Sequence, residues 1–168
     1  DLLSPDRHYM DVQEYSRLGG ESGKPRKHFK VVMKKRRGVG AMVFCLGSPW
    51  TRIAVQLAKR LHGFPYAMYT VKDYRAAVRL AAELASAGGT IAGAPAIDSP
   101  RAIPGGHVTA DPSWELREAD YMSRFEIVNG DILHSLSEGY LEEKHIGPVE
   151  ALREKVLAAM GPENGYFY

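Results

Sequence analysis

Eight cationic side chains stand close together between residues 24 and 37, and this window contains no acidic residue. Runs of Lys and Arg bind phosphate backbones and anionic lipid head groups, and they also dock on acidic protein surfaces. We therefore expect this basic segment to contact a partner, which is another protein, RNA or an anionic lipid. Its cations are Lys24, Arg26, Lys27, Lys30, Lys34, Lys35, Arg36 and Arg37.

A second interpretation leaves the basic segment without a partner. Residues 29–33 then form one strand of a solvated hairpin, residues 38–40 form its turn, and residues 41–46 form its second strand. Phe29 is the single aromatic residue among the cations. Stacking of single-stranded nucleic acid needs several aromatic side chains, so the segment gives it little support.

A candidate anion site lies where a predicted strand meets a predicted helix. Residues 41–46 form a short apolar run, typical of a strand that is buried on both faces. Ser48 and Pro49 then supply an N-cap and a proline at the first helical position. Backbone N–H groups at a helix N-terminus bind anions, so Ser48 is a candidate phosphate contact.

Residues 40–98 show the pattern strand, helix, strand, helix, strand. The first helix begins at Pro49 and ends before Gly63, and the second runs from Tyr74 to a stop at Gly88. Strands are predicted at 66–69 and 90–92. The first helix is amphipathic, and the apolar stripe of such a helix normally faces the core. This stripe consists of Trp50, Ile53, Ala54, Leu57 and Leu61.

The stretch from Ile53 to Asp98 resembles the first βαβαβ half of the short-chain dehydrogenases/reductases. The resemblance rests on the helix sequences AVQLAKRL and RAAVRLAAELASAGG and on Asp98 after the third strand. It covers about a third of the chain and implies a Rossmann-like core, with NAD(P) contacts from Gly47, Ser48 and Asp98. The family's T-G-x-x-x-G-x-G turn is replaced by LGSPWTR, in which only Gly47 remains. Because those glycines admit the pyrophosphate, we expect the fold without bound NAD(P).

The catalytic residues of that family have no convincing counterpart here. Tyr140 and Lys144 match its Tyr-x-x-x-Lys pair, but the upstream serine is missing and neighbouring acids would raise the pKa of the tyrosine. The single cysteine, Cys45, lies in a predicted buried strand, and the six histidines show no paired metal-ligand spacing. We therefore expect no catalytic site, no metal and no cofactor.

These patterns predict an α/β protein with a small Rossmann-like three-layer core of parallel strands and two crossover helices. Residues 1–28 form an extended N-terminal arm, 29–98 the core, 99–123 a surface loop, and 124–168 a hairpin, a helix and an aromatic tail. The hairpin joins 125–128 to 132–136 through Asn129-Gly130, and the last helix begins at Gly147-Pro148. The tail offers Tyr166, Phe167 and Tyr168 as partner contacts.

Composition narrows the class of protein. The chain has 168 residues, of which 45% are hydrophobic and 25% charged, as in an ordinary globular domain. No apolar run is long enough to span a membrane. The single cysteine excludes an internal disulfide, which suits a reducing compartment. The chain begins at Asp1, and removal of an organellar targeting peptide would explain this start.

We expect a non-catalytic accessory subunit of a large assembly, with a mitochondrial respiratory-chain complex as the leading assignment. Its partners would be other protein subunits, reached through the basic segment and the aromatic tail. One alternative is a divergent NAD(P)-dependent oxidoreductase or nucleotide-binding module. A second is a mitochondrial ribosomal protein that binds RNA through residues 24–37. The expected location is mitochondrial, or otherwise cytoplasmic.

Overall fold

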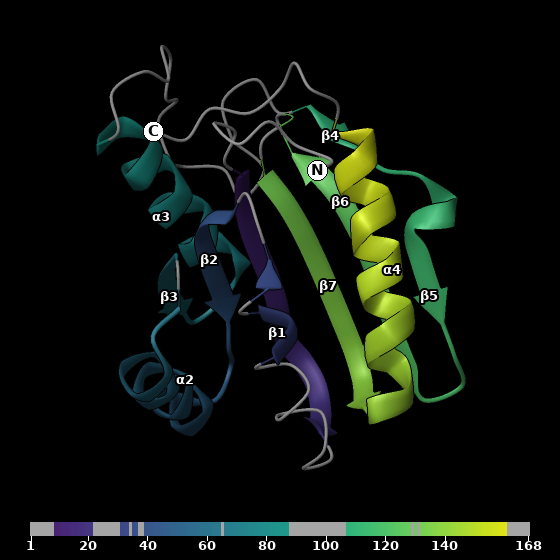
Figure 1. Ribbon diagram of the computed structural model, residues 1–168, viewed down its shortest axis with the longest axis horizontal. Helices are drawn as coiled ribbons and strands as arrows, with labels where there is room; N and C mark the ends of the chain where they lie inside the picture. The colour runs from purple at the N-terminus through teal and green to yellow at the C-terminus, as the bar shows by residue number, and fades with distance from the viewer. Residues whose placement is uncertain are drawn as a thin grey trace.

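The computed structural model describes residues 9–21, 31–33, 35–36, 39–64, 66–87, 107–128, 130 and 132–160. It shows an α/β protein built on one mixed seven-stranded sheet (Figure 1). The strand order is β3-β2-β1-β7-β6-β4, and β5 also pairs with β6. The strands are β1 (Tyr9–Glu21), β2 (Val39–Cys45), β3 (Ala67–Val71), β4 (Val108–Thr109), β5 (Glu115–Arg117), β6 (Tyr121–Val128) and β7 (Ile132–Leu141).

The parallel part of the sheet is formed by β3, β2, β1 and β7. β1 lies at the centre and is parallel to both of its neighbours, β2 and β7. β3 is parallel to β2, and helix α2 (Pro49–His62) makes the crossover between them. β6 runs antiparallel to β7, and β4 and β5 run antiparallel to β6. The predicted α/β fold with parallel strands is therefore confirmed, and α2 is one of the two predicted crossover helices.

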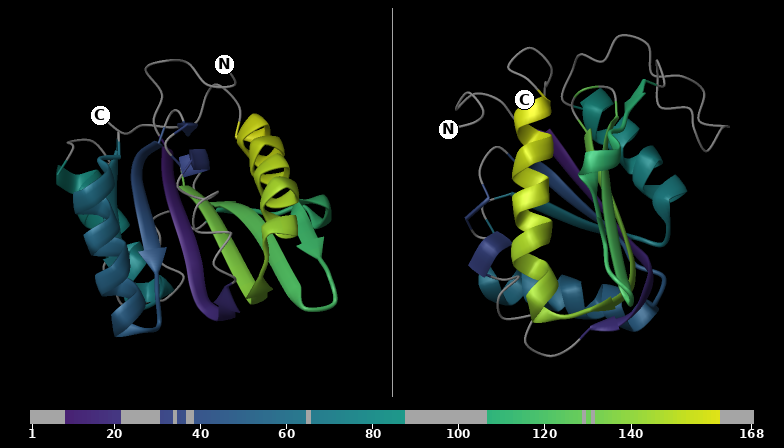
Figure 2. Two further views of the ribbon diagram at one scale, coloured as in Figure 1. Left: turned by 60° about the horizontal axis from the view of Figure 1, so that its bottom comes forward. Right: turned by 90° about the vertical axis from the view of Figure 1, so that its right-hand side faces the viewer.

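Helices cover both faces of the sheet (Figure 2). α4 (Glu143–Ala159) packs on one face, where its Val156 and Leu157 join Leu133 and Phe125 in the larger core cluster. α3 (Tyr74–Ala87) packs on the opposite face, over a second cluster that includes Val12 and Val43 of the central strands. The protein thus has the three predicted layers.

Local signals explain where the helices begin. The Asp73 carboxylate accepts the backbone N–H of Ala76 (2.9 Å) and so caps α3. The prediction that the last helix begins at Gly147 is wrong, since α4 begins at Glu143. Glu142 and His145 cap that end reciprocally, each side chain accepting the backbone N–H of the other. Pro148 is accommodated inside the helix.

The central strand β1 is the main difference from the sequence analysis, which assigned residues 1–28 to an arm outside the core. Residues 9–21 instead lie in the middle of the sheet. The predicted surface loop 99–123 also contributes β4, the 3-10 helix η1 (Pro112–Trp114), β5 and the start of β6. One sheet therefore joins the predicted core to the C-terminal part of the chain.

The C-terminal hairpin is confirmed, because β6 and β7 pair from Val128 opposite Ile132 to Tyr121 opposite Gly139. Gly130 in its turn has φ 81°, a conformation that favours glycine. The alternative hairpin of residues 29–33 with 41–46 is wrong. Residues 31–33 are helical, and β2 pairs in parallel with β1 and β3.

Two further predictions cannot be compared with the structure. The predicted strand at 90–92 and Asp98 lie outside the described residues. Among the helices that are described, none combines the length and the apolar character needed to cross a membrane.

Candidate functional site

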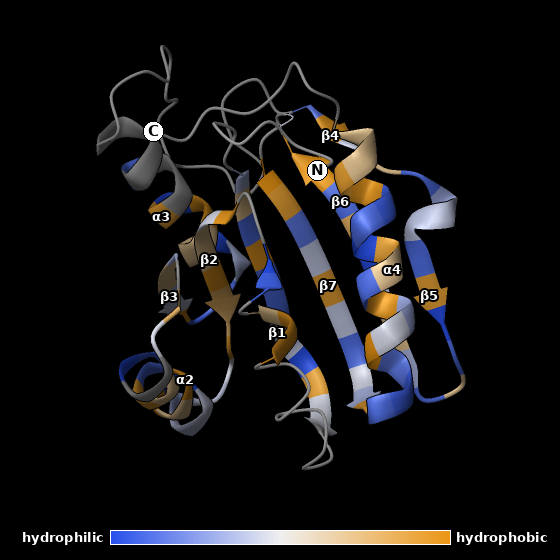
Figure 3. Ribbon diagram, viewed as in Figure 1, coloured by the Kyte–Doolittle hydropathy of each residue, from blue (hydrophilic) through white to orange (hydrophobic). Residues whose placement is uncertain are grey.

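Helix α2 turns its apolar stripe away from the protein. Trp50 is 79% exposed, Ile53 58% and Leu57 55%. Val55, which is about 140° around the helix from Trp50, packs against the core. Hydrophobic and hydrophilic residues alternate along α2 in Figure 3. Trp50, Ile53 and Leu57 therefore face solvent, contrary to the usual orientation of such a stripe, and the side chain of Leu61 is not among those described.

The polar side of α2 holds the helix in this orientation. Arg52 Nη1 donates to the backbone oxygen of Leu46 (2.8 Å), at the turn that leads into the helix. Gln56 Nε2 donates to the Thr70 hydroxyl (2.9 Å). Each such bond contributes about 0.5–1.5 kcal/mol. Since the polar side chains are directed to the sheet, the exposed stripe is a consequence of how the helix docks.

Lys59 makes the third of these contacts and reaches the edge of the sheet. Its Nζ donates to the backbone oxygen of Met68 in β3 (2.9 Å) and lies 5.6 Å from the centroid of the Tyr69 ring. In the described part of the chain, β3 pairs with β2 alone and so forms a sheet edge. Lysine at an edge strand discourages pairing with another chain. Lys59 therefore anchors α2 and covers this edge.

Three large apolar side chains on one helix face form a candidate protein interface. Single exposed hydrophobic residues are common on protein surfaces, but clustered ones mark binding sites. Within the described residues, six large hydrophobic side chains are exposed, and three of them are on α2. Trp50 is also the residue type that most often dominates binding at interfaces. We call Trp50, Ile53 and Leu57 the α2 stripe.

The candidate cofactor residues lie at the turn between β2 and α2. Ser48 occupies the N-cap position with extended backbone, but its side chain makes no capping hydrogen bond. A Cβ placed on Gly47 would lie 3.7 Å from the backbone oxygen of Ser16, an ordinary contact, so a glycine is not needed there for space. Gly47 and Ser48 are adjacent in the chain, and Asp98 lies outside the described residues.

Arg36, which the sequence analysis treated as a partner contact, is buried instead. Its guanidinium pairs with Asp11 of β1 (3.0 Å) and with Glu150 of α4. Burial alone lowers the pKa of Arg36, but these two carboxylates outweigh it and raise the pKa above its usual value. Arg36 therefore belongs to the core. Lys35 beside it is exposed, and Lys24, Arg26, Lys27, Lys30, Lys34 and Arg37 lie outside the described residues.

Asp11 is the centre of this buried polar cluster. Its Oδ2 accepts from Arg36 (3.0 Å), from Gln13 (3.1 Å) and from Arg153 of α4 (3.4 Å). Complete burial raises the pKa of Asp11 to about 6, against the opposing effect of Arg36. Burial also lowers the pKa of Arg153 to about 10, and Arg153 donates to the Tyr9 hydroxyl. The cluster ties β1, Arg36 and α4 together.

On the other face of the sheet, His134 of β7 lies between two carboxylates. Its Nδ1 is 2.6 Å from Glu126 of β6, and its Nε2 is 3.4 Å from Glu14 of β1. Tyr74 of α3 packs on the ring, with centroids 4.3 Å apart. Burial lowers the pKa of His134, but the adjacent carboxylates of Glu126 and Glu14 outweigh it and raise the pKa. This group joins three strands to α3.

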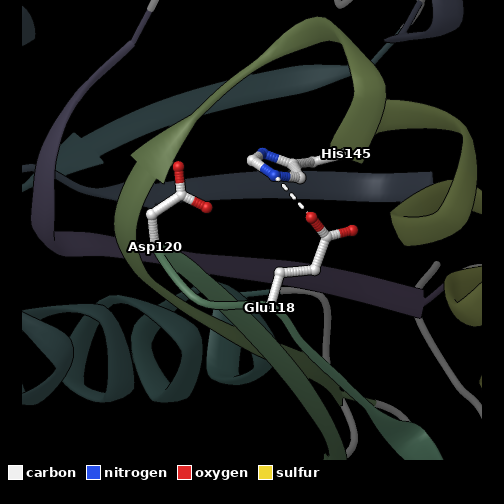
Figure 4. A group of neighbouring side chains, drawn as sticks. All are labelled: Glu118, Asp120 and His145. Carbon is white, nitrogen blue, oxygen red and sulfur yellow. Dashed lines mark ion pairs between the residues drawn. The ribbon is translucent and has the colours of Figure 1, made fainter.

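Glu118, Asp120 and His145 form the one group in the described residues whose ligand atoms lie close enough to hold a metal (Figure 4). These atoms lie within 4.8 Å of one another, and His145 Nε2 is 3.3 Å from a Glu118 oxygen. However, His145 Nδ1 accepts the backbone N–H of Glu142 (2.9 Å), which assigns the proton of a neutral ring to Nε2.

A metal ligand normally needs the opposite arrangement, in which the second ring nitrogen donates its proton. For Nε2 to bind a metal, the cap at the start of α4 would have to break. The side chain of His145 is buried and stacks on Tyr121, with ring centroids 4.4 Å apart. We therefore interpret this group as a structural contact that holds the turn before β6 against the start of α4.

The remaining candidates are placed as follows. Cys45 is buried, as predicted, and burial raises the pKa of its thiol to about 12, so it is a core side chain. Lys144 pairs with Glu142 (2.8 Å) and lies 3.8 Å from Glu118. Tyr166, Phe167 and Tyr168 lie outside the described residues.

Sequence reasoning found the α2 stripe but assigned it to the core, because spacing alone does not show which side of a helix meets the sheet. The charged residues on the opposite side of α2 gave no signal of this orientation, because the same pattern is typical of a helix whose apolar stripe faces the core. Asp11 and His134 gave no local signal, since their partners are far along the chain. Comparison with protein-family models, with curated proteins and with solved structures finds no match in any of the three.

Proposed function

We propose that this protein is a non-catalytic subunit of a larger assembly and that the α2 stripe is the surface through which it binds another subunit. The observation that carries this proposal is the orientation of α2. The helix directs Arg52, Gln56 and Lys59 to its own sheet and leaves Trp50 and Ile53 in solvent.

The energetics favour a bound partner. Burying one large apolar side chain contributes about 1.5–3 kcal/mol. The isolated chain does not obtain this stabilisation from Trp50, Ile53 or Leu57, because all three remain exposed. A partner that covers the stripe would obtain it, less the cost of association and of ordering side chains. The stripe is then the centre of an interface, with further contacts around it.

The kind of assembly follows from the sequence-based expectations. A mitochondrial respiratory-chain complex is the assignment that we propose, with a mitochondrial ribosome as the alternative. The basic segment distinguishes them, because RNA binding through phosphates weakens steeply with salt. Lys35 is the one cation of that segment that the described residues show exposed.

The test is the native size of the protein in a gentle extract of its source, measured by sedimentation with immunodetection. We compare the wild type with Trp50→Ser and Leu57→Ser, and Val108→Ser is the matched control because Val108 is a comparably exposed residue of β4. We expect the wild type and the control in a large particle and the α2 variants near 18.6 kDa. A wild type of small native size, or α2 variants that stay in the particle, would contradict the proposal.

One observation favours the alternative of a nucleotide-binding module. Ser48 occupies the N-cap position of α2, and its side chain makes no capping hydrogen bond. Backbone N–H groups at a helix N-terminus favour an anion such as a phosphate group.

A thermal-shift titration distinguishes this alternative. NAD(H) or NADP(H) would raise the unfolding midpoint of the wild type, and Ser48→Glu would abolish the rise by placing a carboxylate beside the phosphates. An unchanged midpoint in the wild type removes the alternative. The sedimentation result for the α2 stripe does not depend on this outcome.

A further inference from the structure

We infer that the partner presents an amphipathic α-helix to the α2 stripe, and that acidic residues border the apolar face of that helix. This inference rests on the proposed function, because it names the occupant of the same surface. Three properties of the described residues support it: the state of the β3 edge, the shape of the stripe and the charge of α2.

The β3 edge does not favour a partner that adds a strand. Strand addition needs free N–H and C=O groups along an edge. Lys59 Nζ already bonds the backbone oxygen of Met68, and Gln56 bonds the side chain of Thr70 on the same strand. A partner strand would have to displace both side chains. A partner can contact the α2 stripe without displacing any of these bonds.

The shape of the stripe suits a helix. Trp50, Ile53 and Leu57 are spaced three and four residues apart, so they follow one side of α2 over about two turns, or roughly 10 Å. Such rows of side chains are the ridges that pack into the grooves of a neighbouring helix. Ala54 is exposed between them and leaves room for a side chain of the partner.

The charge of α2 determines which charged residues should flank the apolar face of the partner helix. α2 contains three cations, Arg52, Lys59 and Arg60, and no acidic residue. Arg52 and Lys59 donate to the backbone oxygens of Leu46 and Met68, and Lys59 and Arg60 are both exposed. Arg60 follows Ile53 by seven residues, which places both on nearly the same side of the helix. A carboxylate beside the partner's apolar face would meet Arg60, whereas a cation there would be repelled.

The experiment is site-specific photo-crosslinking in the source cells, with Ala54→benzoylphenylalanine in the full chain. The crosslinked peptide is identified by mass spectrometry and its sequence is read. We expect a segment with apolar residues at helical spacing and Asp or Glu beside them. We also expect Arg60→Glu to lower the crosslinking yield about tenfold, which corresponds to about 1.4 kcal/mol. Arg79→Glu is the control, because Arg79 is an exposed cation of α3.

The outcomes separate this inference from the proposed function. A crosslinked segment in which apolar and polar residues alternate, as in a β-strand, overturns the inference while the α2 stripe remains an interface. A helical segment with Lys or Arg beside its apolar face does the same. An Arg60→Glu yield equal to that of the control overturns it as well. The absence of any protein crosslink from Ala54 overturns both the inference and the proposed function.

Discussion

Lys59 Nζ lies 2.9 Å from the backbone oxygen of Met68 and so connects α2 to the edge strand β3. This hydrogen bond has two effects. It holds α2 with the α2 stripe in solvent, and it occupies an oxygen at the sheet edge that another strand could use. Lys59 thus lies between the exposed α2 stripe and an edge strand, where a lysine discourages pairing with another chain.

The first prediction concerns this contact. We expect Lys59→Ala to lower the free energy of unfolding by about 0.5–1.5 kcal/mol, the contribution of one hydrogen bond. We also expect the variant to self-associate, because the β3 edge is uncovered. Light scattering after size-exclusion chromatography measures the second effect. Lys35→Ala is the control, since Lys35 is exposed. A monomeric Lys59→Ala would show that Lys59 does not protect the edge.

The second prediction concerns the buried cluster around Asp11. We expect Arg36→Met to lower the free energy of unfolding by about 3–5 kcal/mol, because it removes the ion pairs of Arg36 with Asp11 and Glu150 and leaves the buried Asp11 with the longer contact to Arg153. Arg17→Met removes an exposed pair with Glu138, which solvent screens, and should lower stability far less than Arg36→Met. Urea unfolding measures both values. Equal losses would mean that Asp11 does not depend on Arg36.

The third prediction concerns pH. The carboxylates of Glu14 and Glu126 raise the pKa of His134 above its usual value in the folded protein. A group with a raised folded pKa contributes stability that is complete below its unfolded pKa, about 6.5, and is lost as the pH rises through the folded value. We therefore expect the free energy of unfolding to fall as the pH rises above about 6.5.

His134→Gln should reduce this pH dependence, while His107→Gln, a change at an exposed histidine, should preserve it. Urea unfolding across a pH series gives the comparison. An identical slope for His134→Gln and the wild type would show that the imidazolium does not link β7 to Glu14 and Glu126.

The fourth prediction concerns Gly139 of β7, which pairs with Tyr121 of β6. Gly139 has φ +90°, and a Cβ there would lie 2.1 Å from the backbone oxygen of Asp120. That oxygen also accepts the N–H of Tyr140 (2.9 Å), so it cannot move away freely. We expect Gly139→Ala to lower the free energy of unfolding by about 1–3 kcal/mol or more.

Gly19→Ala is the matched control, because its Cβ would meet the nearest atom at an ordinary 3.6 Å. We expect it to change stability by less than about 1 kcal/mol. Thermal unfolding compares the two variants. If Gly139→Ala is as stable as Gly19→Ala, the backbone around Gly139 relaxes more easily than the contact with Asp120 implies.

Prediction from the sequence worked where the signal is local. The apolar run of β2, the proline at the start of α2 and the Asn129-Gly130 turn each act within a few residues, and the corresponding elements form. β1 was missed because Asp11 and Gln13 interrupt the continuous apolar run that is expected of a strand buried on both faces. The start of α4 was misplaced because Pro148 masked the cap formed by Glu142 and His145.

The sequence by itself determined the α/β class, the crossover helix between β2 and β3, and the amphipathic character of α2, because periodicity, capping and turn preferences are properties of short segments. Only the tertiary structure decided that β1 is central, that Arg36 is buried with Asp11, and that the α2 stripe faces solvent. These outcomes depend on pairings between residues far apart in the chain. The spacing of apolar residues in a helix does not show whether they face the protein's own core or solvent. The contacts of Lys59 and Arg52 with the sheet decide between the two orientations of α2.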